Sequence, residues 1–145
     1  MIDLRKLRTG NKILLETKEC VFEIEVINPE NGFVNISGGK RFIIPTVATI
    51  LGSYGFTEDD ATERLVKELC IDKNYGVQIH YTDKEDISCD IITSVVVSAK
   101  ISGDGWSYEV WENDEKKKIL NQAIDEAIAR NRISIAEETN EDTDL

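Results

Sequence analysis

"SGGKRFIIPTVATILGSYG", residues 37–55, contains a glycine pair, two adjacent cations, a proline inside an apolar run and a Gly-Ser-Tyr-Gly end. It lacks the residue spacing of a phosphate-binding loop and the G-x-S-x-G spacing of a nucleophile elbow. Proline has no N–H for a strand ladder, and glycine supplies the conformations that turns need. The stretch therefore predicts a strand that is broken at Pro45, followed by a β-branched run over residues 46–51, with corners at its glycines. Lys40 and Arg41 are expected to be exposed in a turn.

Upstream of this stretch, residues 20–37 predict a β-hairpin. Apolar residues alternate with Glu23 and Glu25, which gives one buried and one solvated face. The segment NPENG (residues 28–32) has the composition of a tight turn. Residues 12–17 predict a further strand before the hairpin.

Downstream, the local pattern of residues 58–70 favours a helix, and an extended conformation of this segment stays open. Acids crowd its start, and Leu65, Val66, Leu69 and Cys70 fall on one helical face. Strands are then expected at residues 76–82, 90–101 and 106–111, with a turn at residues 102–105.

The C-terminal part predicts an amphipathic helix over residues 114–132, followed by an acidic, disordered tail over residues 135–145. The whole chain predicts a single domain over residues 1–134. Its class is α+β, mostly antiparallel β: a small partly closed barrel, or two packed sheets, with a C-terminal amphipathic helix.

The charge of the chain is uneven. Its formal net charge is −11; residues 1–57 carry seven Lys/Arg against six Asp/Glu, and residues 58–145 carry ten against 22. Such a field repels nucleic acid and anionic membranes and favours a basic protein partner. The sequence shows neither a membrane-spanning apolar run nor a signal-peptide core, so a cytoplasmic location is expected.

The sequence gives little support for a metal centre or for catalysis. Its one histidine and three scattered cysteines form no ligand pair at metal-binding spacing, so neither metal nor cofactor is expected, and the thiols are expected to be reduced. A hydrolase alternative would have to assemble Ser53, His80 and Asp83, or pair carboxylates near the tryptophans, such as Asp104 and Glu109.

The succession from Leu7 and Gly10 through the glycine pair, Phe42, Pro45 and Gly52-Ser53 is a recognisable pattern, and residues 93–96 continue it with a Thr-Ser-x-Val strand. Over roughly residues 4–101 the chain resembles a family of small, functionally uncharacterised bacterial proteins. The resemblance implies a compact β-fold in the manner of an SH3-like barrel and implies no activity.

Together these observations predict a non-catalytic protein-binding or assembly module. Its expected contact residues are Lys40, Arg41, Tyr54 and Trp111, because exposed cations and aromatic residues beside strand ends are suited to anchoring a partner. Two alternatives stay open: an acidic mimic of nucleic acid that binds a basic protein, and a small hydrolase. A homo-oligomer is also compatible with the sequence.

Overall fold

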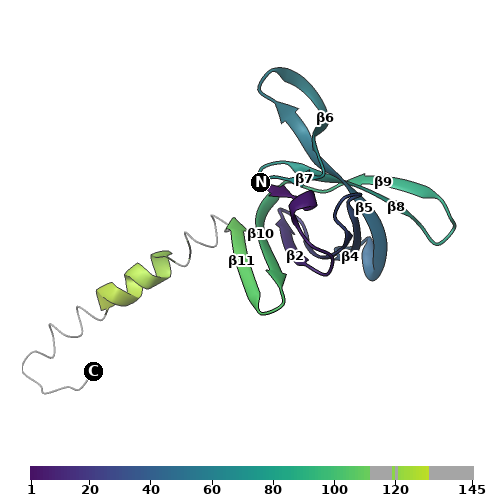
Figure 1. The fold of residues 1–145 in the computed structure, drawn as a ribbon. Coiled ribbons are helices and arrows are strands. Elements are labelled where there is room, and N and C mark those ends of the chain that lie inside the picture. Colours follow the sequence, from purple (N-terminus) through teal and green to yellow (C-terminus); the bar gives the residue numbers. More distant parts are fainter. Residues whose placement is uncertain (112–118, 120, 131–145) are drawn as a thin grey trace, which may run out of the picture. The chain divides into compact units, whose positions relative to one another are not determined.

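The computed structural model describes residues 1–111, 119 and 121–130. The chain divides into a unit of residues 1–112 and a unit of residues 113–145. The first is built of antiparallel strands, and in the second residues 119 and 121–130 are helical (Figure 1). The remainder of the predicted 114–132 helix and the predicted tail at 135–145 lie outside the described residues. The coarse prediction, an α+β chain that is mostly antiparallel β, is confirmed.

The described part of the first unit forms one large sheet and one small one. Along the large sheet the strand order is β11-β10-β2-β3-β4-β5-β8-β9, with β6 also paired to β5, and every pairing is antiparallel. The small sheet pairs β1 with β7, and a 3-10 helix, Leu4–Lys6, follows β1. The strands are β1 (Ile2–Asp3), β2 (Lys12–Thr17), β3 (Val21–Asn28), β4 (Phe33–Gly38), β5 (Phe42–Thr57), β6 (Asp60–Glu68), β7 (Cys70–Ile71), β8 (Gly76–Thr82), β9 (Ser88–Ile92), β10 (Val96–Gly103) and β11 (Trp106–Trp111).

The predicted β3–β4 hairpin is confirmed. Its turn contains Gly32 at φ +72°, and the alternating residues Phe22, Ile24 and Val26 are buried while the glutamates between them are exposed. The period-two pattern was sufficient here because both strands have one face in the core and one in solvent.

From Phe42 onward the glycine- and proline-containing stretch is one strand, β5, and the predicted break at Pro45 is wrong. Gly38 lies opposite Phe42 and Ile36 lies opposite Thr46, so residues 43–45 form a bulge that accommodates the missing N–H of Pro45 within the strand. Gly52 is also inside the strand. One edge of β5 pairs with β4 up to Thr49 and with β6 from Gly52 onward, while the other edge pairs with β8.

The predicted helix at 58–70 is wrong, because most of that segment is β6. Leu65 lies opposite Tyr54 and Lys67 lies opposite Ser53, and beyond Tyr54, where the pairing with β8 ends, β5 and β6 continue as a two-stranded arm (Figure 1). Pairing with β5 outweighs the local helical preference of an acidic segment with only four clustered apolar residues. The arm ends at Leu69, whose φ of +55° breaks the strand before β7.

The predicted strand at 90–101 is also wrong as a single element. It is divided into β9 and β10 by residues 93–95. The hydroxyl of Thr93 accepts a hydrogen bond from Val77 N at 3.0 Å, and Val96 N donates to the carbonyl of Tyr75 at 2.9 Å. These bonds hold the connecting residues against the start of β8, so the chain leaves β9 and enters β10 beside β2.

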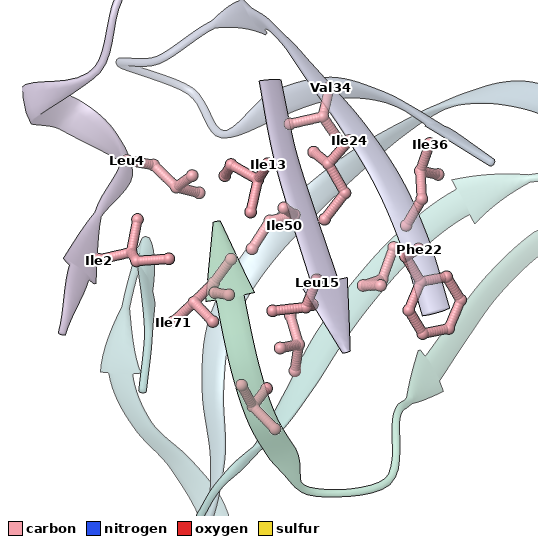
Figure 2. Packing of buried hydrophobic residues seen from close by; sticks show 14 of the residues in the cluster. Ile2, Leu4, Ile13, Leu15, Phe22, Ile24, Val34, Ile36, Ile50 and Ile71 are labelled. Carbon is pink, nitrogen blue, oxygen red and sulfur yellow. The ribbon is translucent and has the colours of Figure 1, made fainter. Parts of the chain in front are cut away.

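One apolar cluster fills the first unit, and the N-terminus completes it. Ile2 and Leu4 lie beside Ile13, Ile50 and Ile71 at one end of the cluster (Figure 2). Leu4 is fully buried, and its N–H donates to the carbonyl of Leu69 at 2.9 Å. The first residues of the chain therefore close this end of the core through the β1–β7 pair.

Candidate functional site

Strand β9 ends the large sheet on one side and leaves a free backbone edge. The backbone of Val77 faces Thr93, and Asp83 N donates to the carbonyl of Ile87 at 2.9 Å. Backbone groups of an antiparallel strand alternate between its two edges. Those of Cys89 and Ile91 therefore point to β8, whereas those of Asp90 and Ile92 point away from it. No other strand of the described residues pairs with that edge.

A hollow of about 900 Å³ lies beside this edge, and we name it the β9 groove. On one side it is lined by β9 and the residues that follow it, from Asp90 to Ser94. The other side is lined by the β2–β3 turn with the start of β3, and by the β4–β5 turn with Lys40 and Arg41. A volume of this size falls within the range of ligand-binding sites.

The glycine pair Gly38-Gly39 shapes the far wall of the β9 groove. Gly38 has φ +119°, and a Cβ there would lie 2.2 Å from the carbonyl oxygen of Val21. Gly39 has φ +63°, and a Cβ there would lie 3.2 Å from Cys20 Sγ. Glycine therefore lets the β4–β5 turn pack closely on the start of β3. This packing leaves the exposed side chains of Lys40 and Arg41 at the rim, as the sequence predicted.

Arg41 is held in place by an aromatic row. Its Nη1 donates to the hydroxyl of Tyr81 at 3.1 Å, and this hydrogen bond raises the pKa of Arg41. Tyr81 packs edge-on against Phe42, with ring centroids 5.1 Å apart, and Phe42 packs in the same way against Phe22 at 6.3 Å. Like any arginine, Arg41 is charged at all ordinary pH values, and the bond to Tyr81 uses only one of its five N–H groups.

The end of the groove near β10 is fixed by hydroxyl groups. Ser94 Oγ donates to Thr17 Oγ1 at 2.8 Å and accepts from the backbone N–H of Glu19 at 3.1 Å. Thr93 Oγ1 donates to the carbonyl of Ser94 at 2.8 Å. These bonds join the β2–β3 turn to residues 93–94 and make the groove a preformed feature of the fold.

The other two predicted contact residues lie elsewhere. Tyr54 lines a separate hollow of about 600 Å³ with Phe56 and Tyr75, and that hollow shares residues 92–94 with the β9 groove. Trp111 is half-buried and packs against the core, whereas Trp106 in the same strand is exposed. The structure therefore brings Lys40 and Arg41 together, places Tyr54 in the neighbouring hollow and keeps Trp111 apart from both.

The first residue set of the hydrolase alternative, Ser53, His80 and Asp83, is not assembled. Ser53 is fully buried, and its hydroxyl donates to the carbonyl of Cys70 at 2.9 Å. In the β5–β8 pairing Ser53 lies opposite Val77, while His80 lies opposite Thr49. His80 Nδ1 instead contacts Asp90 Oδ1 at 2.6 Å. Asp83 Oδ1 accepts hydrogen bonds from Glu85 N and Ile87 N, both at 2.9 Å, and so shapes the β8–β9 turn.

Metal binding finds no support either. Within the described ranges, no cluster of three or more His, Cys, Asp or Glu side chains is placed to hold a metal ion. The three cysteines are free thiols, as expected. Burial raises the pKa of Cys70, and the nearby charge of Asp3 adds to this effect. That thiol is therefore kept protonated, while Cys20 in the β9 groove and Cys89 are half-buried.

Sequence reasoning missed the free edge itself, because it joined β9 and β10 into one strand. The available signal was the Thr93-Ser94 pair, whose short polar side chains compete with the strand ladder for backbone partners.

No protein-family model, curated protein or solved structure matches this chain. The resemblance over residues 4–101 therefore stays a prediction. Among the described residues, no helix has the length and apolar content needed to cross a membrane.

Proposed function

We propose that this protein is a non-catalytic binding module that takes up an extended segment of a partner protein along β9. The observation that carries the proposal is the free edge of β9 beside the β9 groove. A segment there would pair with the outward backbone groups of Asp90 and Ile92, as in strand addition to a sheet edge. Its alternate side chains would face the groove and provide selectivity.

We further propose that the first unit is a partly closed barrel whose gap is the β9 groove. Support comes from bonds between strands near opposite ends of the sheet path: before β8, Asn74 N donates to the carbonyl of Val96 at 3.0 Å, and Val96 N, at the start of β10, donates to the carbonyl of Tyr75. A bound strand would extend the sheet from β9 toward the turns on the far wall.

Among the residues that the structure describes, neither alternative function has a comparable observation in its favour. On the outer face of the sheet, Glu25 lies directly opposite Lys12, and the hollow over Glu23 and Glu25 also contains Lys100. Carboxylates that alternate with lysines do not form the single-sign array that mimicry of nucleic acid requires.

The test uses peptides selected on the full-length protein from a phage-displayed library of random heptapeptides. Ile92→Pro removes an outward N–H without removing any bond to β8, and prolines are tolerated at such edge positions. Ile92→Thr shortens the same side chain and keeps the N–H. We expect selected peptides to bind the wild type and Ile92→Thr and to lose at least about tenfold in affinity on Ile92→Pro. Equal binding to all three proteins would contradict strand addition.

A further inference from the structure

The β9 groove continues past Arg41 into a second hollow of about 470 Å³, which we name the Arg41–Lys84 hollow. Arg41 lines both hollows, and the second is also lined by Ile43, Ile44 and Thr46 of β5 and by residues 81–84. A segment that lies along β9 and extends toward the β8–β9 turn would lie near Arg41, which lines both hollows.

The floor of the second hollow is unusually apolar for an exposed surface. Ile43 is 82% exposed and Ile44 is 60% exposed, and Val47 of the same strand is 64% exposed. The β5 bulge is the cause, because it displaces residues 43–45 from the β4 ladder. Neighbouring exposed isoleucines that line a hollow are typical of an interaction site rather than of an ordinary surface.

Exposed cations lie beside this apolar floor, together with the exposed acids Glu85 and Asp86 of the β8–β9 turn, although the chain as a whole has a net charge of −11. Lys40, Arg41 and Lys84 are exposed. The hollow's own acid, Asp83, has its Oδ1 occupied by two backbone N–H groups of its turn. Two acids line the β9 groove, Asp90 and Glu19. Asp90 contacts His80. The guanidinium of Arg41 can thus offer its remaining N–H groups to a carboxylate of the partner.

From this arrangement we infer that the segment bound along β9 carries an acidic side chain at Arg41, followed by a branched apolar side chain that packs on Ile43 and Ile44. The inference rests on the proposed function and specifies its ligand: an extended peptide with an acidic residue next to an apolar one. A fork-shaped pair of N–H donors matches a carboxylate, and two exposed isoleucines match a Val, Ile or Leu side chain.

The experiment repeats the heptapeptide selection on full-length wild type and on Arg41→Glu. Arg8→Glu serves as the matched control, because Arg8 is exposed, makes the same charge change and lines neither hollow. Peptides selected on the wild type are expected to be enriched in Asp or Glu followed by a branched apolar residue. Their affinity for Arg41→Glu should be roughly ten- to a hundredfold lower than for the wild type, and their affinity for Arg8→Glu should equal that for the wild type. Their affinity for the wild type should be lower at high salt than at low salt.

The outcomes separate this inference from the proposed function. Peptides that need Ile92 N–H but show no acidic preference and bind Arg41→Glu equally well would overturn the inference and leave strand addition intact. A library that yields no binding peptide would overturn both. A concentration-dependent dimer of the wild type that is lost in Ile43→Glu would assign the apolar floor to a second copy of the chain and overturn the acidic-peptide ligand. Melting temperatures equal to that of the wild type would show that a variant loses binding or dimerisation for a reason other than unfolding.

Discussion

Gly52 is a single residue that allows β5 to pair with three neighbouring strands. Its φ is +146°, and a Cβ would lie 2.0 Å from the carbonyl oxygen of Lys67 and 3.0 Å from the Cα of Glu68. Both atoms belong to the backbone of β6, so no side-chain rotation can make room. Gly105 also has a positive φ, +75°, but a Cβ at that residue would have nothing within 4 Å of it.

We therefore expect Gly52→Ala to lower the free energy of unfolding by about 3 kcal/mol or more, because backbone strain and overlap act together. Gly105→Ala should cost only about 1–2 kcal/mol, since it adds strain without overlap. Urea unfolding of both variants, followed by circular dichroism, gives the comparison. If Gly52→Ala and Gly105→Ala lowered the free energy of unfolding equally, β6 would not approach β5 as closely as the structure places it.

At the scale of elements, the β5–β6 arm is the largest departure from the sequence prediction. Directly opposed residues of an antiparallel pair have Cα atoms about 4.5–5.5 Å apart, a separation that a disulfide can span. Tyr54 and Leu65 are such a pair. In a helix over residues 58–70, Leu65 would have no fixed position relative to Tyr54.

In a background with the three native cysteines changed to serine, Tyr54→Cys with Leu65→Cys should form an intramolecular disulfide in a glutathione buffer. The matched pair Tyr54→Cys with Arg64→Cys should remain mostly reduced, because Arg64 pairs with Gly55 and, as the neighbour of Leu65 in a regular part of the strand, points to the opposite face. Peptide mapping by mass spectrometry measures both. Similar oxidation of the two pairs would argue against the β6 register.

The sequence predicted those elements whose local pattern and tertiary environment agree. The strand predicted from the alternation over residues 22–26 was confirmed because one face of that hairpin is buried and the other is solvated, as the pattern requires. The helix prediction for the β6 segment was wrong because the conformation of that segment is set by backbone pairing with β5. Such pairing gives the residues of β6 no alternating apolar pattern of their own. The sequence indicated that Lys40 and Arg41 lie exposed in a turn. Their position across the β9 groove from β9 depends on residues about fifty positions away in the chain and on a strand end fixed by Thr93.

At the scale of the first unit, stability depends on contacts between distant parts of the chain. Leu4 closes the core beside Ile71, and the adjoining Cys70 is buried through its pairing with Asp3. The thiol of Cys70 should therefore react only when this unit opens. Its raised pKa lowers the thiolate fraction further at any given pH, because the thiolate is the reactive form.

Leu4→Ala leaves a cavity in the core and should cost about 2–5 kcal/mol. At constant pH, alkylation of Cys70 by iodoacetamide is then expected to accelerate by roughly 30-fold or more, while the half-buried Cys89 keeps its rate and serves as the internal reference. Mass spectrometry of the labelled peptides gives both rates. Equal acceleration of the two thiols, or none at Cys70, would contradict a core closed by the N-terminus.

The unpaired edge of β9 also bears on how the protein behaves at high concentration. An exposed strand edge can template aggregation, and natural sheets counter this with charged residues. Here Asp90 lies on β9 itself, and Lys84, Glu85 and Asp86 lie in the turn that precedes it. Mutual repulsion of Glu85 and Asp86 disfavours pairing between two copies through this edge. Concentrated salt would weaken that repulsion, so the tendency of a purified sample to aggregate depends on the same strand that we propose for recognition.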